Sequence, residues 1–222
     1  MVYVIKVGGS LYPEYIMDLY EVFKKSDEKI ILINGGGELA NKLREYNNEY
    51  NFTDDTNHWN AIMCMDIIGN QICDMCDDII PIRSFDEIDE VHKNGKIPLI
   101  LSYELLKKFD LLAHSWDVTS DSIACWIAHK LNAKLLILTN INGIYNGNIY
   151  SKNKRLIQDI SPNELLFFDE TCVDKCLPQL LLDYQVDCFI LNGKYPDRIF
   201  RFLNNQFSEN EFYTHIGGKL KW

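Results

Sequence analysis

KVGGS at residues 6–10 (Lys6-Val7-Gly8-Gly9-Ser10) follows an apolar run at residues 2–5, and NGGG at residues 34–37 (Asn34-Gly35-Gly36-Gly37) follows another at residues 30–33. Short runs of apolar and β-branched residues predict buried strands. We therefore expect two strands that each run into a glycine turn and then into a helix. Glycines let backbone N–H groups approach an anion closely, and a helix N-terminus adds favourable partial charge. Two such turns, one with a lysine beside its glycines, favour an enzyme that handles phosphate groups.

A third glycine segment, Asn142-Gly143, follows the apolar run at residues 135–138. Further strands are expected at residues 79–82, 96–101, 187–191 and 212–216. Helices are expected at residues 15–25, 38–46, 58–76, 85–92, 121–131, 164–168, 172–184 and 197–204. This alternation predicts an α/β fold with a mostly parallel central sheet and helices on both faces. Ligands bind at the carboxyl ends of parallel strands, where the glycine segments are expected to meet.

Two polar stretches interrupt this pattern. Residues 47–57 are rich in Asn and Asp and predict a loop that is a candidate lid, and residues 150–160 predict a hairpin or irregular excursion. Neither stretch has the composition of a linker between domains. We therefore expect one domain over residues 1–222.

Composition excludes several classes of protein. The chain has 222 residues, 47% of them hydrophobic, with a net charge of -10 and a pI of about 4.9. This acidity disfavours nucleic acid as a partner, because phosphate-backbone binding needs a basic face. No apolar run approaches the ~20 residues of a membrane span, and no secretory signal pattern opens the sequence, so we expect a cytoplasmic protein.

The sequence has 7 cysteines, and Cys73 and Cys76 form a CxxC pair. An odd number of cysteines without a signal pattern favours free thiols in a reducing compartment. No second pair lies at the spacing of a zinc site, and the CxxC falls late in an expected helix. Core and helix positions are the simpler interpretation of these cysteines, and a redox or metal role is the alternative.

The chain lacks the GxxxxGK[ST] loop of P-loop kinases and the HRD and DFG pairs of protein kinases. KVGGS, NGGG, the segment SWDVTSDSIACWIAHKLNAKLLILTNINGIY at residues 115–145, and THIGG at residues 214–218 together resemble the amino acid kinase superfamily. The resemblance implies a three-layer sandwich with an acceptor-binding half (1–114) and a nucleotide-binding half (115–222). It also implies ATP and Mg²⁺ as cofactors and a homo-oligomeric assembly.

The family's functional positions transfer to this chain one by one. The resemblance implies that Lys6 contacts the transferred phosphoryl group and that Asp121 organises the lysines and is a candidate ligand of Mg²⁺, which ATP phosphates mainly hold. A second catalytic lysine matches Lys175, where the alignment is loose. The positions implied to bind ATP are Gly8, Gly9, Ser10, Thr139, Asn142, Gly143, Tyr145 and Lys152. The family segment carries aspartates where this chain has Asn140 and Asn142, which weakens any carboxylate contact there.

SWDVTSDSIA (115–124) and VDKCLP (173–178) resemble a small archaeal subgroup of this family more closely. Its members phosphorylate [5-(aminomethyl)furan-3-yl]methyl phosphate to the diphosphate in methanofuran biosynthesis. For this acceptor we expect Gly35, Gly36 and Gly37 to hold the phosphate. We further expect Asp117 to meet the ammonium and Trp116 to pack on the furan ring.

Other functions stay open. Uridylate kinase is the alternative enzyme, because it also phosphorylates a phosphate, and a non-enzymatic oxyanion-binding protein of the same fold is the alternative class. Isopentenyl phosphate kinase and fosfomycin-resistance kinase carry a histidine after the second glycine turn, whereas GGGELANKLREY at residues 35–46 has none. Retention of Lys6 and Asp121 favours an enzyme.

Each candidate residue also has a purely structural interpretation. Lys6 could be a solvated lysine at a strand end, and Ser120-Asp121 before an apolar helix is a good N-cap pattern. Asp117 could be a turn residue, His58 a cap-region residue and Trp59 a core residue. Phosphoryl transfer needs cations at the phosphoryl oxygens more than covalent chemistry from the protein. A lysine beside a glycine turn supplies that need, which favours the functional interpretation of Lys6.

Overall fold

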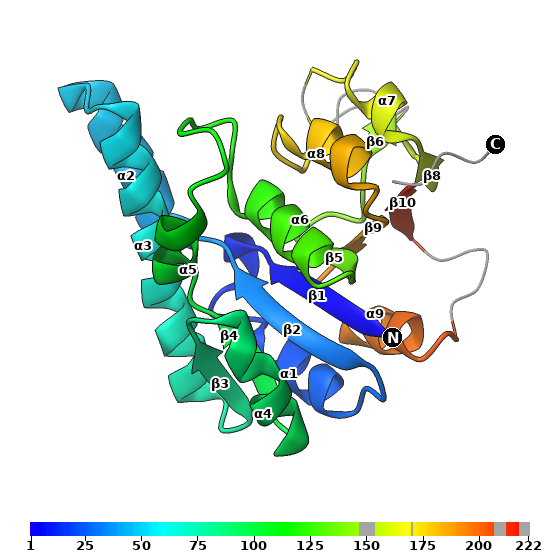
Figure 1. The fold of residues 1–222 in the computed structure, drawn as a ribbon. Helices are drawn as coiled ribbons and strands as arrows, with labels where there is room; N and C mark the ends of the chain where they lie inside the picture. Colours follow the sequence, from blue (N-terminus) through cyan, green and yellow to red (C-terminus); the bar gives the residue numbers. More distant parts are fainter. Residues whose placement is uncertain (147–153, 170, 207–211, 218–222) are drawn as a thin grey trace.

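The computed structural model describes residues 1–146, 154–169, 171–206 and 212–217. Within them, one eight-stranded sheet has the order β3-β4-β2-β1-β5-β9-β10-β8 (Figure 1). Its strands are β1 (Val2–Val7), β2 (Lys29–Asn34), β3 (Ile79–Ile82), β4 (Ile97–Ile100), β5 (Lys134–Thr139), β8 (Asp159–Ile160), β9 (Cys188–Asn192) and β10 (Tyr213–Ile216). All neighbouring pairs are parallel except β9 and β10. The predicted mostly parallel sheet is confirmed.

A second, two-stranded sheet pairs β6 (Tyr145–Asn146) with β7 (Arg155–Leu156) in antiparallel fashion. Of its two strands, β7 falls in the predicted excursion at residues 150–160, whose residues 150–153 lie outside the described part of the chain, and β6 precedes it. The strands of the central sheet are short apolar runs, and all but the first residue of β1 and of β2 are buried. Burial on both faces of the sheet accounts for the near-continuous apolar sequence of these strands.

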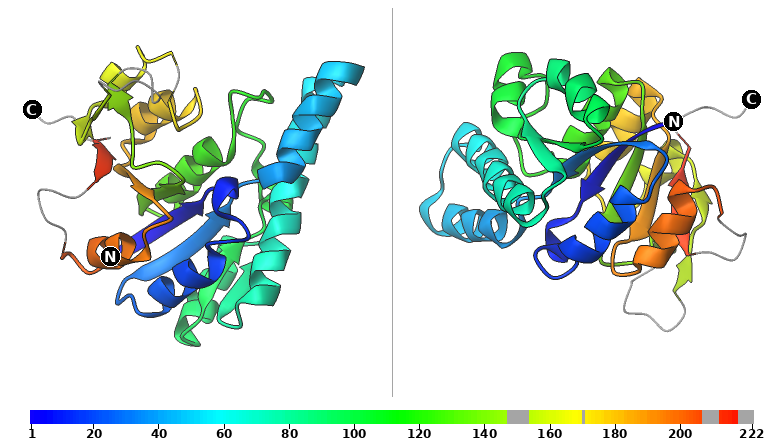
Figure 2. Two further views of the ribbon diagram at one scale, coloured as in Figure 1. Left: turned by 180° about the vertical axis from the view of Figure 1, so that it is seen from behind. Right: turned by 90° about the horizontal axis from the view of Figure 1, so that it is seen from below.

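Helices cover both faces of the sheet (Figure 2). They are α1 (Ile16–Lys24), α2 (Gly37–Tyr50), α3 (Asp54–Met75), α4 (Ile88–Lys93), α5 (Ser102–Phe109), α6 (Ser120–Lys130), α7 (Pro162–Leu165), α8 (Leu177–Tyr184) and α9 (Pro196–Leu203). One core contains Phe23 of α1 and Ile199 of α9, and the other contains Trp126 of α6 and Leu181 of α8. The three-layer arrangement is thus confirmed. No helix in the described ranges is both long enough and apolar enough to cross a membrane.

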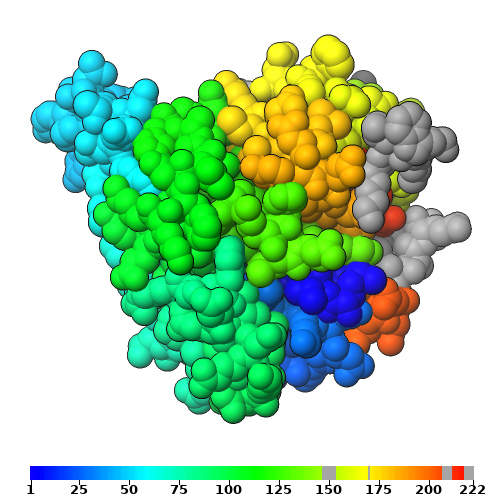
Figure 3. Space-filling model, in the orientation of Figure 1, coloured from blue at the N-terminus to red at the C-terminus, as the bar shows by residue number. Residues whose placement is uncertain are grey.

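The long helix α3 contributes to both cores. Ile62 and Met65 pack in the core of α6, whereas Ile68 and Ile72 pack in the core of α1. α2 packs against this helix and has no buried residue of its own. In Figure 3 the cyan ends of α2 and α3 project from the upper left of the surface beside the green part of the chain.

The predicted loop at residues 47–57 is wrong. α2 continues to Tyr50 and α3 begins at Asp54, so only three residues join them. Asn51 ends α2 in the left-handed region, with a φ of 59°. Thr53 then caps α3, because its Oγ1 accepts from the N–H of Thr56 at 3.3 Å. Packing of α2 on α3 outweighs the low helix propensity of the Asn-rich sequence.

Three further elements differ from the sequence expectations. The sequence does not predict α5, whose first N–H groups, at Ser102 and Tyr103, donate to the carboxylate of Asp66. α8 begins at Leu177 rather than at residue 172; its N-cap is Cys176, and the Leu177 N–H donates to the carboxylate of Asp174. The KVGGS turn leads into a 3₁₀ turn (Gly9–Leu11) rather than directly into an α-helix, and α1 begins only at Ile16.

The 7 cysteines are free thiols. Burial raises the pKa of Cys73 to about 12 and that of Cys76 to about 11. Thiols with such pKa values are poor nucleophiles at neutral pH. The described residues contain no group of three or more His, Cys, Asp or Glu side chains placed to hold a metal ion.

Candidate active site

The three glycine segments meet at one edge of the sheet. Val7 is in register with Asn34 of β2 and with Leu138 of β5, so these strands end side by side. The Gly8 N–H donates to the Leu138 carbonyl at 2.8 Å, and the Gly35 N–H donates to the Val7 carbonyl at 2.9 Å. These two N–H groups extend the sheet and are not available to a ligand. An anion at this edge must therefore meet the amides that follow them.

The first two glycine turns touch one another. A Cβ on Gly9 would lie 2.4 Å from the Cα of Gly37, and a Cβ on Gly35 would lie 3.0 Å from the Gly9 nitrogen. Gly37 opens α2 with a φ of +52°, which favours glycine. The turn expected to hold ATP phosphates and the turn expected to hold the acceptor phosphate are therefore in direct contact.

Lys6 and Asp121 form a buried ion pair below these turns. Lys6 Nζ lies 2.7 Å from Asp121 Oδ1, with 10% and 6% of the two side chains exposed. Oδ1 receives no well-directed hydrogen bond from the described residues, so its contact with Lys6 is ionic. Thr119, not Asp121, is the N-cap of α6. The interpretations of Lys6 as a solvated lysine and of Asp121 as an N-cap are therefore wrong.

Asp174 fixes the position of Asp121; it lies in the VDKCLP segment but is not among the predicted site residues. Its carboxylate accepts five hydrogen bonds: from the N–H and hydroxyl of Thr119 (2.8 and 2.9 Å), from the N–H and hydroxyl of Ser122 (3.0 and 2.6 Å), and from the Leu177 N–H (2.9 Å). The Asp174 N–H in turn donates to Asp121 Oδ2 at 3.2 Å. Burial, followed by the nearby Asp121 carboxylate, raises the pKa of Asp174. This residue ties the start of α6 to the start of α8.

A cavity of 310 Å³ opens beside the second glycine turn. It is lined by Gly35, Gly36 and Gly37, by one face each of α2 and α3, and by the segment at residues 115–120. On α3 the lining residues recur at helical spacing, and they are Asp54, Asn57, His58, Ala61, Ile62 and Met65. The sequence predicts a helix over residues 58–76 but does not indicate that one of its faces lines a cavity. Asp54 and Asn57 continue this face and carry no sequence signal of a site. His58, which the sequence favours as a cap-region residue, lies inside α3, because the helix begins at Asp54.

Trp116 lines this cavity, and the guanidinium carbon of Arg44 lies 4.7 Å from the centre of its ring. Asp117, in contrast, does not line the cavity. It lines a neighbouring hollow of 540 Å³, together with Lys175 and Asp174. The carboxylate of Asp117 is 3.8 Å from Lys175 Nζ, and both side chains are exposed. The structure therefore places Trp116 with the predicted acceptor turn, and Asp117 and Lys175 beside it in the second hollow.

The predicted nucleotide-binding segment lies at the ends of β5 and β9. The Thr139 carbonyl accepts from the Gly193 N–H at 2.8 Å. Asn142 Oδ1 accepts from Asn192 Nδ2 at 3.1 Å and from Arg198 Nη1 at 3.2 Å. Arg198 is not identifiable from the sequence, because it lies more than fifty residues from Asn142 along the chain. It supplies a cation at this edge of the sheet.

Gly143 and Tyr145 complete this segment. Gly143 has a φ of +142°, and a Cβ there would lie 2.3 Å from Thr214 Oγ1. The same hydroxyl accepts from the Ile144 N–H at 2.8 Å, which anchors the segment to β10. Tyr145 lies in β6. Lys152, the remaining candidate, lies outside the described residues.

Residues 1–171 match the amino acid kinase family. The chain belongs to this family. It is 30% identical to the [5-(aminomethyl)furan-3-yl]methyl phosphate kinase of Methanocaldococcus jannaschii, over 97% of this chain and 98% of the relative. The predicted family is thereby confirmed, and the protein is a phosphotransferase, as its relatives are kinases.

Solved structures share the fold at low sequence identity. Uridylate kinase from Archaeoglobus fulgidus matches with a TM-score of 0.76 at 16% identity, over 98% of this chain and 100% of that chain. Aspartate kinase from Synechocystis matches with a TM-score of 0.74 at 12% identity, over 100% of this chain and 40% of that chain. Kinases named for different acceptors therefore share this fold, and the fold alone does not identify the acceptor.

Proposed function

We propose that this kinase transfers the terminal phosphoryl group of ATP to the phosphate of a small phosphomonoester and forms a diphosphate. The proposed acceptor is [5-(aminomethyl)furan-3-yl]methyl phosphate. The observation that carries this choice is the 30% identity to a kinase named for that acceptor over nearly the full length of both chains. A cavity of 310 Å³ beside a glycine turn at a helix N-terminus is consistent with a small phosphorylated acceptor.

The roles of individual residues follow from the two touching turns. The N–H groups of the first turn of α2 have no acceptor within the helix, so they are suited to the phosphate of the acceptor. ATP phosphates on the turn at Gly8–Gly9–Ser10 would then face that phosphate directly. Both groups are anionic, and their approach requires a fixed cation between them. Lys6, buried just below this contact and oriented by Asp121, is the cation proposed for that task.

One residue of this site, Asp121, is suited to bind Mg²⁺. Asp121 Oδ1 is a buried oxygen without a well-directed hydrogen bond, and oxygen ligands are those that Mg²⁺ prefers. The described residues offer no larger group of metal ligands. Mg²⁺ would therefore be held mainly by the ATP phosphates, with Asp121 as a protein ligand, and would neutralise charge on the phosphoryl oxygens. The protein residues align the two phosphates.

An acceptor panel tests the proposal. The purified kinase is incubated with ATP, Mg²⁺ and either the aminomethylfuran phosphate, UMP, isopentenyl phosphate or an unphosphorylated furan alcohol, and each product is identified by mass. We expect the diphosphate of the aminomethylfuran, with kcat/KM at least about tenfold above that for UMP. A preference for UMP would assign the protein as a uridylate kinase. Binding of ATP without transfer to any acceptor would reject the proposal.

A further inference from the structure

The α3 side chains that line the cavity change from apolar to polar along the helix. Beside the second glycine turn the α3 wall of the cavity is apolar, because Ala61, Ile62 and Met65 line it there. His58 lines the cavity one helical turn earlier, and Asp54 lines it one turn before that. A helix rises 1.5 Å per residue, so Asp54 lies about 10 Å along the axis from the glycine end. The far end of the cavity is therefore polar.

His58 is a buried side chain without a polar partner. It is 8% exposed and lines the cavity. Its ring stacks on His114, with 4.2 Å between centroids, and meets the Trp59 ring edge-on at 5.0 Å. Neither of its ring nitrogens is hydrogen-bonded within the part of the chain that the structure describes. The ring nitrogens are not among the fully buried unpaired atoms, so they face the open cavity, where a ligand group can bond to them.

The charges around His58 keep its ring neutral. Burial, then the charge of His114, lowers the pKa of His58 to about 4; Lys107 acts in the same direction, and Asp55 and Asp110 act against it. Hydrogen bonds to Asp55 (2.6 Å) and Asp110 (2.8 Å) shift the pKa of His114 in the opposite direction and raise it. His58 therefore offers the cavity a neutral imidazole with a free lone pair.

Asp54 is the carboxylate beside this ring. Among the described residues it has no ion-pair or hydrogen-bond partner for its side chain. The second carboxylate of the lining, Glu38, lies at the glycine end in the first turn of α2 and contacts Asn41 at 3.4 Å. Arg44 is the arginine of the lining, and it lies over Trp116. Asp54 is therefore an exposed carboxylate in the first turn of α3, at the end of the cavity remote from the glycines, and no described side chain pairs with it.

We propose that Asp54 and the neutral ring of His58 bind the primary ammonium of the acceptor. This inference rests on the proposed function, because the named acceptor carries a phosphate at one end and an aminomethyl group at the other. An ammonium has three donors and no acceptor, so it needs a carboxylate or a lone pair at each contact. Asp54 supplies the carboxylate, and His58 supplies a lone pair that a protonated histidine would lack. The phosphate at the glycine end and the ammonium at Asp54 then fix the direction of the acceptor.

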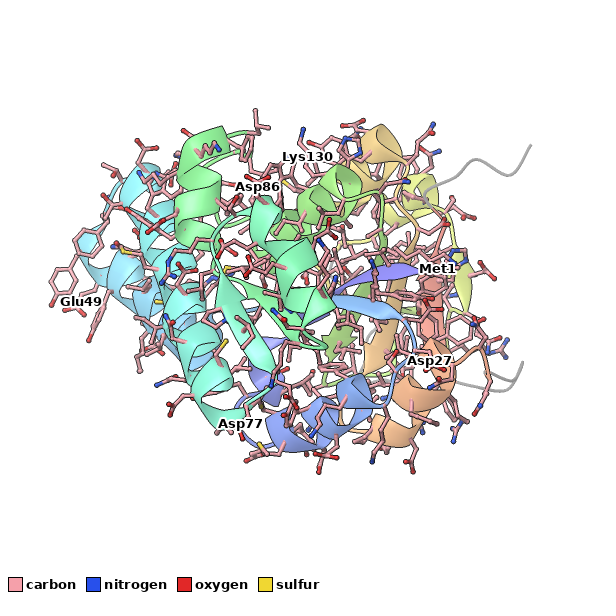
Figure 4. The ribbon with its side chains drawn as sticks, turned by 60° about the horizontal axis from the view of Figure 1, so that its bottom comes forward. Met1, Asp27, Glu49, Asp77, Asp86 and Lys130 are labelled. Atoms are coloured by element: carbon pink, nitrogen blue, oxygen red, sulfur yellow. The ribbon has the colours of Figure 1, made fainter. Side chains whose placement is uncertain are left out.

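The test compares the aminomethylfuran phosphate with an analogue that carries a methyl group in place of the aminomethyl group. The readout is the ratio of kcat/KM for the amine to kcat/KM for the analogue. We expect Asp54→Asn to lower this ratio about ten- to hundredfold, mainly through KM for the amine. His58→Leu should lower it as well, and His58→Gln, whose carbonyl accepts a hydrogen bond, should retain part of the preference. Glu49→Gln is the matched control, because it removes a carboxylate at the outer end of α2 (Figure 4).

The outcomes separate this inference from the proposed function. If the wild-type enzyme phosphorylates both compounds with equal kcat/KM, the ammonium subsite is wrong and the phosphate kinase remains. If it phosphorylates neither, the proposed function fails and the subsite fails with it. A ratio that collapses in Asp117→Asn but not in Asp54→Asn would move the subsite to the neighbouring hollow and overturn the assignment. Thermal unfolding of each variant checks that the protein is folded, and His58→Gln gives a second result if Asp54→Asn does not fold.

Discussion

Lys6 Nζ and Asp121 Oδ1, 2.7 Å apart and almost fully buried, join β1 to α6 directly below the contact between the two glycine turns. A buried charge that loses its partner is strongly destabilising, because its desolvation is no longer offset. The pair therefore affects folding and chemistry together, and its variants have to be designed so that the two effects can be separated.

Lys6→Ala is expected to lower turnover about 10²- to 10³-fold, the usual cost of a preorganised charge at a developing transition state. It should also lower the free energy of unfolding by about 3–5 kcal/mol, since Asp121 is left unpaired. Steady-state kinetics and urea denaturation measure the two effects.

The double variant Lys6→Ala/Asp121→Asn provides the control. Neutralising the unpaired carboxylate should restore most of the lost stability without restoring turnover. If turnover returned together with stability, Lys6 would be a structural residue and its assignment to the phosphoryl group would be wrong.

Asp174→Ala is expected to destabilise the protein by at least about 3 kcal/mol, because buried N–H groups at the starts of α6 and α8 lose their acceptor. Turnover should fall as well, since these helix starts position Asp121. Asp183→Ala is the control: Asp183 is exposed and contacts Gln179, so the change should stay within about 0.5 kcal/mol. The denaturant midpoints of the two variants are compared with that of the wild type, at an unchanged slope of unfolding free energy against denaturant concentration. Equal midpoints for the two variants would contradict the anchoring role of Asp174.

His114 should make stability depend on pH. Hydrogen bonds to Asp55 and Asp110 raise its pKa above the ordinary value of 6.5. A histidine whose folded pKa is raised contributes stability that is complete below pH 6.5 and is lost as the pH rises through the folded pKa. We expect the free energy of unfolding to fall as the pH is raised above 6.5 in the wild type, and this fall to be absent in His114→Gln.

The lowered pKa of His58 has the opposite effect, but only between about pH 4 and 6.5. Above that window His58 is neutral in both the folded and unfolded states. Denaturation curves are therefore compared at several pH values above 6.5, where the slope of the free energy of unfolding against pH reports on His114. A slope in His114→Gln equal to that of the wild type would show that another group titrates.

The edge of the sheet could be predicted because its signals are local. An apolar run, two or three glycines and a lysine occupy adjacent positions, and the parallel topology brings those strand ends together. The far end of the acceptor cavity could not be predicted in the same way. Asp54 lies in a stretch whose composition indicates a loop, and His58 directly follows it. Both become part of a cavity wall only because α2 packs on α3.

Asp174 illustrates a second limit. It lies more than fifty residues from Thr119 and Ser122 along the chain, and no local pattern indicates that its carboxylate caps another helix. The sequence favours a functional role for the neighbouring Lys175 instead, because a lysine within a segment that resembles the family can be recognised from the sequence alone. The tertiary contact that makes Asp174 important is visible only in the folded structure.

Gly9→Ala tests whether contact between the two turns matters for turnover. The added Cβ would lie 2.4 Å from the Gly37 Cα, so the turns must move apart. Misplacement of reacting groups by about 1 Å can cost about 100-fold in rate, and we expect a loss of that size in kcat. Overpacking should add about 1–3 kcal/mol of destabilisation.

Gly95→Ala is the matched control for this variant, because it adds the same methyl group away from the glycine turns. Gly95 precedes β4 at the amino end of that strand, has a φ of +68°, and a Cβ there would meet no atom of the described residues within 4 Å. The free energy of unfolding of the control should fall by about 1–2 kcal/mol, because alanine is strained at a left-handed backbone position. Its turnover should be unchanged. Similar losses of stability with a large difference in turnover would support phosphoryl transfer across the Gly9–Gly37 contact, and equal turnover in the two variants would rule it out.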